Sequence, residues 1–154
     1  MTIRERIEQD TKSSLRAGDA RRLSVLRMLS STIHNREIEK RAKGIGGELT
    51  DEEVLQAIRS ELKKRTDAID AYDKGHRPEA AERERSEAEI LKAFLPPELS
   101  DEELLKVVRE GIAKLAVSSE KDSGKLMGWV MQRVKGQASG DRVVAVVKQE
   151  LEAA

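Results

Sequence analysis

Two consecutive prolines, Pro96 and Pro97, constrain the fold of this chain more than any other feature of its sequence. Proline has no backbone N–H to donate and its ring clashes with the turn before it, so a helix cannot continue through such a pair. Just after the pair, Ser100 and Glu103 have the spacing of a capping box, in which each side chain satisfies a free N–H at the start of a helix. The sequence therefore predicts two domains, over residues 1–95 and 100–154.

Start and stop signals for helices recur through the first domain. Thr2 and Glu5 have the spacing of a capping box, as do Thr50 and Glu53. Gly18 suits the left-handed residue that ends a helix. Four helices are expected, over residues 2–17, 19–43, 50–74 and 78–93.

The third of these helices has a short heptad pattern. Its apolar residues alternate by three and four positions, and Arg65 interrupts the series at one seam position. Such a pattern favours packing against the apolar stripe of the second helix, as an antiparallel hairpin. The two stripes contain Leu55, Ile58, Leu62, Ile69 and Tyr72 in the third helix and Leu23, Leu26, Leu29 and Ile33 in the second.

Three shorter helices are expected in the second domain, over residues 101–115, 120–135 and 140–152. Each has a dense apolar face for its length, as a compact three-helix domain requires. No convincing strand pattern appears anywhere in the chain. We therefore predict an all-α protein, in which a long-helix hairpin region precedes a small three-helix domain.

The composition agrees with this fold class and narrows the chemistry. Of 154 residues, 38% are charged and 2% are aromatic. Cysteine is absent, which excludes disulfides, thiolate metal sites and a cysteine nucleophile. No apolar run has the length of a membrane span, and the N-terminus lacks the apolar core of a signal peptide, so a cytoplasmic protein is expected.

Motifs of common enzymes are also missing. The sequence contains no phosphate-binding loop of the G-x-x-x-x-G-K-[ST] type and no H-E-x-x-H zinc motif. Its two histidines, His34 and His76, stand far apart without neighbours that would complete a metal cluster. From these patterns we predict no catalytic residue, no metal site and no cofactor.

Charge is balanced over the whole chain but not along it. Residues 1–43 carry 11 basic and 6 acidic side chains, and residues 121–148 carry 6 and 2. Clustered basic residues can contact phosphates, but they can also form a solvated helix face that pairs with the acidic middle of the chain. Both readings stay open for the four arginines of a secondary basic patch, Arg16, Arg21, Arg22 and Arg27.

The most unusual segment is GKLMGWVMQRVKG, residues 124–136. Gly124 and Gly128 stand four apart in a helical pattern, where each glycine costs about 1 kcal/mol relative to alanine. Their spacing favours the close approach of a second helix inside the small domain. The only tryptophan, Trp129, either fills the core or stacks on a partner.

The turn GQASGD, residues 136–141, follows directly. Gly136 can end one helix in the left-handed conformation, and Ser139 or Asp141 can begin the next. The start of a helix presents free N–H groups and a positive dipole end, which suits a phosphate beside Lys135 and Arg142.

These segments together resemble the GatB/YqeY family, in particular its small stand-alone YqeY-like proteins. The resemblance extends over nearly the whole chain. It implies a long-helix N-terminal part and a C-terminal domain similar to the tail domain of the B subunit of glutamine-dependent aminoacyl-tRNA amidotransferases. The matching segments are RLSVLRML (22–29), LTDEEVLQAI (49–58), EAEILKAFLPPELSDEEL (87–104) and, most specifically, KDSGKLMGWVMQRVKGQASGDRV (121–143).

In those amidotransferases the tail domain contacts transfer RNA, and the catalytic centres lie elsewhere. The resemblance therefore implies an RNA-facing surface in the second domain of this chain. Its candidate residues are Lys121, Lys125, Lys135 and Arg142, with the glycines Gly124, Gly128, Gly136 and Gly140.

The family label is that of carbon–nitrogen ligases that use glutamine as amide donor. This chain has no glutaminase nucleophile and no room for an ATP-dependent domain, so an autonomous enzyme is the least supported reading. The leading expectation is a non-catalytic accessory that binds transfer RNA or a tRNA-dependent amidotransferase complex. The alternative is a protein-interaction module that binds no nucleic acid, which an exposed apolar patch would favour.

Overall fold

The computed structural model describes residues 1–153 and confirms the all-α prediction. Within these residues the chain forms seven α-helices, one short 3-10 helix and no strand. None of these helices is long and apolar enough to cross a membrane. The chain divides into two compact units, an N-terminal unit, Met1–Leu95, and a C-terminal unit that begins at Pro96.

The N-terminal unit contains four helices close to the expected positions: α1 (Ile3–Ala17), α2 (Ala20–Ala42), α3 (Asp51–Lys74) and α4 (Pro78–Lys92). Both capping boxes form, with the Thr2 hydroxyl accepting from the N–H of Glu5 at 3.1 Å and the Thr50 hydroxyl from that of Glu53 at 3.3 Å. Gly18 ends α1 in the left-handed conformation, with a φ of 71°. These helix ends follow from the local sequence, because a capping box involves residues only three apart.

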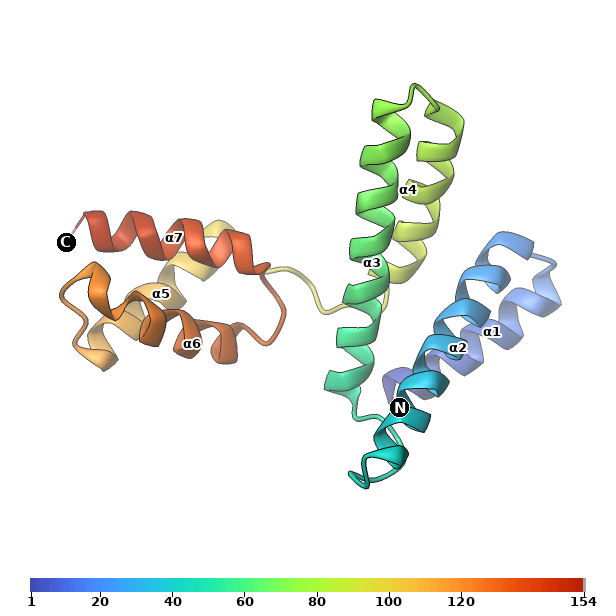
Figure 1. The fold of residues 1–154 in the computed structure, drawn as a ribbon, viewed down its shortest axis with the longest axis horizontal. Coiled ribbons are helices and arrows are strands. Elements are labelled where there is room, and N and C mark those ends of the chain that lie inside the picture. The colour runs from blue at the N-terminus through green and yellow to red at the C-terminus, as the bar shows by residue number, and fades with distance from the viewer. Residues whose placement is uncertain (154) are drawn as a thin grey trace. The chain divides into compact units, whose positions relative to one another are not determined.

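The four helices form two hairpins, α1 with α2 and α3 with α4, whose members lie side by side (Figure 1). The expectation that α3 would pair mainly with α2 is therefore wrong. Three residues link α3 to α4, whereas eight link α2 to α3, and a short link favours antiparallel neighbours. Arg65, which interrupts the heptad pattern, is buried against α4, where its guanidinium pairs with Glu84 at 3.1 Å and with Glu87.

The two hairpins of the N-terminal unit share one apolar core. Between them, α2 also reaches α3 through two hydrogen bonds, from Thr32 to Glu61 at 3.3 Å and from Arg36 to Ser60 at 3.0 Å. All four helices therefore contribute to one packed body. The buried core residues are Ile7, Val25, Leu26, Leu29, Ile33, Val54, Ile58, Leu91 and Phe94.

The C-terminal unit contains α5 (Asp101–Leu115), the 3-10 helix η1 (Glu120–Asp122), α6 (Ser123–Val134) and α7 (Gly140–Glu152). The helix expected over residues 120–135 thus begins with a 3-10 turn. Ser100 and Glu103 form the expected capping box at the start of α5, at 3.2 Å. The three α-helices pack around a core that includes Leu104, Val108, Leu126, Val130, Val134, Val143, Val147 and Leu151 (Figure 1).

Candidate nucleic-acid interface

Helix α6 has one buried face and one open face. Leu126, Val130 and Val134 are buried in the core of the C-terminal unit. Gly124 and Gly128 are exposed, and a β-carbon added to either glycine would meet no atom within 4 Å. The expectation that these two glycines let a second helix approach is therefore wrong, because nothing in residues 1–153 packs against them.

The close approach occurs instead at Gly111 of α5. This glycine is buried, and an added β-carbon would lie 2.7 Å from Cε3 of Trp129 and 2.8 Å from Cδ1 of Leu126. Sequence reasoning missed this position, although a signal was present. Gly111 lies seven residues after Leu104 and three after Val108, so it falls on the buried stripe of α5.

Trp129 is half-buried and belongs to the packing of the C-terminal unit. Its indole ring packs on Gly111, and the guanidinium of Arg133 lies 5.5 Å from the ring centroid. Arg133 in turn lies 3.9 Å from Glu110 of α5. Trp129 is therefore a packing residue at the contact between α5 and α6, and not an open platform for stacking.

Three candidate lysines surround the open face of α6. Lys121 lies in η1, Lys125 lies in the first turn of α6 and Lys135 is the C-cap of that helix, and all three are exposed. None of them forms an ion pair or a side-chain hydrogen bond within the described part of the chain. Gly124 and Gly128 lie on one side of α6, because they are four residues apart, and Lys135 directly follows the last residue of that helix. We call Lys121, Gly124, Lys125, Gly128 and Lys135 the lysine–glycine face.

The turn between α6 and α7 contains the other two candidate glycines. Lys135 and Gly136 both adopt left-handed conformations, with φ of 46° and 78°. Ser139 caps α7 as expected, since its hydroxyl accepts from a backbone N–H of that helix at 3.3 Å. Gly140 is the first residue of α7 and has open space beside it, but Asp141 places a carboxylate in the same turn. The start of α7 therefore already has a negative group near its positive dipole end.

Arg142 is engaged within the C-terminal unit, unlike the three lysines. Its guanidinium donates to the carbonyl of Leu99 at 2.8 Å and pairs with Asp101 at 2.9 Å and Glu98 at 3.7 Å. The N–H of Leu99 also donates to the carbonyl of Gln137 at 2.7 Å. These contacts hold the segment after Pro97 against the start of α7, so Arg142 stabilises the fold of the C-terminal unit.

The secondary basic patch does not behave as one surface. Arg22 is half-buried and pairs with Asp10 at 3.2 Å, while Arg21 donates to the hydroxyl of Ser86 at 3.0 Å. Arg16 and Arg27 are exposed and form no ion pair within residues 1–153. Two of the four arginines are thus occupied by contacts inside the N-terminal unit.

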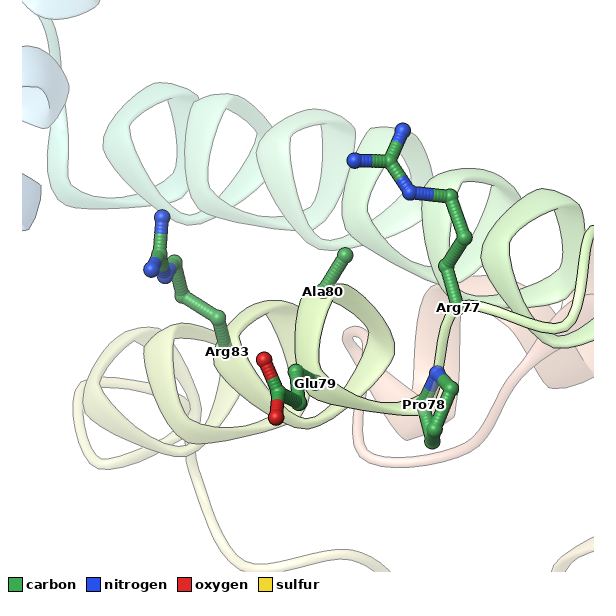
Figure 2. Close-up of a pocket in the computed structure, with 5 residues that line it drawn as sticks. All are labelled: Arg77, Pro78, Glu79, Ala80 and Arg83. Carbon is green, nitrogen blue, oxygen red and sulfur yellow. The ribbon is translucent and has the colours of Figure 1, made fainter.

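A further hollow, of about 380 Å³, lies at the start of α4 (Figure 2). Arg77 and Arg83 lie at opposite ends of the hollow and both point toward α3, and Glu79 lies between them in the view. The guanidinium of Arg77 lies 5.6 Å from the ring centroid of Tyr72. Arg77 is already in contact with Tyr72, and the carboxylate of Glu79 offsets the positive charge of the two arginines. The hollow is therefore less suited to binding an anion than the lysine–glycine face.

The described residues contain no group of three or more histidine, aspartate or glutamate side chains that could hold a metal ion. The fold and the site together define a small all-helical protein that exposes a positively charged face on a three-helix C-terminal unit. A family model described as Yqey-like protein matches residues 4–151, and the chain belongs to this YqeY-like family.

Two curated relatives match over most of this chain, and both are named altered inheritance of mitochondria protein 41, mitochondrial. The relative from Pyrenophora tritici-repentis is 24% identical over 148 residues, which cover 95% of this chain and 78% of the relative. The relative from Lachancea thermotolerans is 30% identical over 148 residues, which cover 92% of this chain and 76% of the relative. The similarity thus includes both units.

Proposed function

We propose that this YqeY-like protein is a non-catalytic accessory that binds transfer RNA through the lysine–glycine face of its C-terminal unit. One observation carries the proposal. Three exposed lysines without partners in residues 1–153 surround two helical glycines against which none of those residues packs.

The two glycines lower the stability of α6, and no packing contact within residues 1–153 compensates for that loss. A glycine within a helix destabilises it by about 1 kcal/mol relative to alanine. At Gly128 an alanine side chain would fit freely, since no atom lies within 4 Å of the added carbon. A flat stretch of helix backbone does serve a partner that must come close, and the lysines around it suit the phosphates of a nucleic acid.

The choice of transfer RNA rests on the resemblance of the C-terminal unit to the amidotransferase tail domain. A tail-like domain without an attached catalytic centre would act by binding. Transfer RNA alone, or transfer RNA held within an amidotransferase complex, is then the expected ligand. Arg142 is left out of this surface because its guanidinium is bound to Leu99 and Asp101.

Replacement of Lys121, Lys125 and Lys135 by alanine tests the proposal. Binding of fluorescently labelled transfer RNA would be measured by anisotropy over a range of salt concentrations. Each lost phosphate contact makes the negative slope of log K against log salt shallower by about 0.9, the duplex value. The triple variant should therefore bind more weakly, and the magnitude of its slope should be smaller by about 2 to 3.

A charge-matched control separates this face from the general charge of the protein. Lys63, Lys106 and Lys114 are also exposed and lie on α3 and α5. Their replacement by alanine removes the same charge and should leave binding nearly unchanged. Equal losses in the two triple variants, or no transfer RNA binding by the parent protein, would contradict the proposal.

A protein-interaction module is the second candidate function, and exposed apolar side chains favour it. Val144 is 50% exposed and Met131 is 37% exposed, both in the C-terminal unit. Crosslinking in cells, with identification of both the RNA and the protein that are captured, distinguishes the two functions. Capture of one defined protein without RNA would favour the module.

The proposed function is compatible with a location in the cytoplasm or in mitochondria. The sequence was expected to belong to a cytoplasmic protein, whereas the relatives are named as mitochondrial proteins. Transfer RNA is present wherever translation takes place, so the proposed function suits the cytoplasm and a translating organelle equally. Cell fractionation followed by immunodetection of the full chain would assign the compartment.

A further inference from the structure

A groove of about 310 Å³ runs between α6 and α7, beside the lysine–glycine face. Its floor is apolar and consists of Met127, Val144, Val147 and Leu151. Met127 lies three residues after Gly124, so the groove and the lysine–glycine face adjoin at the start of the same helix. The volume is at the lower end of the range of about 300–1,000 Å³ that small-ligand sites occupy.

Three polar side chains of different character also line the groove. Glu120 provides a carboxylate, Ser123 a hydroxyl and Lys148 an ammonium group. None of these side chains forms an ion pair or a hydrogen bond with another group in residues 1–153. An acceptor, a donor and a cation are therefore available together around an apolar floor.

We propose that this groove receives one unstacked base of the RNA that the lysine–glycine face binds. The inference rests on the proposed function, and it adds that the protein prefers RNA with unpaired nucleotides. Bases that are splayed out of loops and single strands are commonly read by contact with their faces and by hydrogen bonds to their edges. Here the apolar floor would contact a face of the base, and Glu120 and Ser123 would meet its edge.

The charges around the groove complement the nucleotides on either side of such a base. Lys121 lies in η1 next to the lining residue Glu120, and Lys148 lies on α7 and lines the groove itself. A base that enters between them brings its two flanking phosphates toward these ammonium groups. The lysines are thus placed for the backbone and the groove for the base.

The two walls of the groove differ in length. On α6 the lining runs from Ser123 to Met127, which is little more than one helical turn, whereas on α7 it runs from Val144 to Leu151, which is two turns. The volume of about 310 Å³ and the polar groups Glu120, Ser123 and Lys148 at its edge suit one planar polar group such as a base.

The substitution Val144→Asn tests the inference in the full chain. Two RNA probes of the same sequence are used, a single strand of about 12 nucleotides and the corresponding perfectly paired duplex. The parent protein should bind the single strand at least fivefold more tightly, although the duplex has the higher charge density. Val144→Asn should abolish most of this preference while it leaves duplex binding and its salt slope unchanged.

Two further variants keep the result interpretable. Val144→Thr makes the smallest polar change at the same position and should reduce the preference in part. Leu115→Asn alters another exposed apolar residue of the same unit, 38% exposed on α5, and should have no effect. Far-ultraviolet circular dichroism would confirm that all the variants fold.

The outcomes separate this inference from the proposed function. Tighter binding of the duplex by the parent protein, or an unchanged preference in both Val144 variants, would overturn the inference and leave RNA binding intact. Equal loss on both probes would also overturn it, since a base-binding groove distinguishes them. Binding of neither probe nor of transfer RNA would refute the proposed function, and this inference with it.

Discussion

Gly111 and Trp129 are in direct packing contact, and a β-carbon at Gly111 would lie 2.7 Å from Cε3 of the indole ring. This contact brings α5 and α6 together across the C-terminal unit. The glycines of this unit therefore differ in whether another residue packs against them. Gly111 is required by packing, whereas Gly124 and Gly128 face open space.

Replacement of Gly111 by alanine should destabilise the C-terminal unit. The added methyl group would clash with the rigid ring of Trp129, and such overpacking costs about 1–3 kcal/mol. Urea unfolding followed by the fluorescence of Trp129, the only tryptophan, would measure the effect. A midpoint equal to that of the parent protein would show that the ring moves aside at no cost.

The same substitution at Gly128 should have the opposite effect on stability. An alanine there meets no atom within 4 Å and favours the helix, so the free energy of unfolding should rise by up to about 1 kcal/mol. If the open glycine serves a partner, the more stable variant should nevertheless bind transfer RNA less tightly. A gain in stability without any loss of binding would remove the glycines from the proposed surface.

Arg142→Ala should lower the stability of the C-terminal unit. The substitution removes hydrogen bonds to the Leu99 carbonyl and to Asp101, and a cost of about 1 kcal/mol is expected because the guanidinium is partly exposed. Lys135→Ala is the matched control, since Lys135 is exposed and forms no ion pair in the described residues. Chemical denaturation of both variants should show a loss only for Arg142→Ala.

Glu53→Gln should reduce the sensitivity of the protein to acid. The ammonium group of Lys40, at 2.8 Å, and the backbone N–H of Thr50 hold the pKa of Glu53 below its ordinary value of 4.5. A lowered pKa in the folded state stabilises the protein above pH 4.5, and this contribution is lost as the pH falls through the folded pKa. The parent protein should therefore lose more stability than Glu53→Gln when the pH falls below 4.5.

Urea midpoints at pH 7 and at about pH 3.5 would measure this difference. Glu52→Gln is the control, because Glu52 is exposed in the same helical turn and its side chain forms no hydrogen bond within residues 1–153. An equal change in the two variants would show that the effect arises from net charge and not from the capping box.

A fragment of residues 96–154 should fold without the N-terminal unit. It contains a complete apolar core, the capping box at Ser100 and the contacts of Arg142 with the segment after Pro97. The loss of helicity and the change in Trp129 fluorescence should coincide in a single cooperative transition. A gradual loss of helicity would mean that the core needs the N-terminal unit for support.

The sequence alone determined where most of the helices begin and end. The capping boxes at Thr2, Thr50 and Ser100 and the left-handed glycine at position 18 all formed as expected. These signals depend on hydrogen bonds between residues three to five apart, so no distant part of the chain can alter them greatly. The all-α class followed from the same local patterns.

Only the tertiary structure decided which side chains these helices bring together. The heptad pattern of α3 predicted α2 as its hairpin partner, whereas the structure pairs α3 with α4, and the ion pairs of Arg65 with Glu84 and Glu87 depend on that pairing. In the same way, spacing placed Gly111, Gly124 and Gly128 on helices but could not show which glycine another helix covers. Packing joins residues that are distant in sequence, and the burial of each side chain therefore becomes defined only once its helix has a partner.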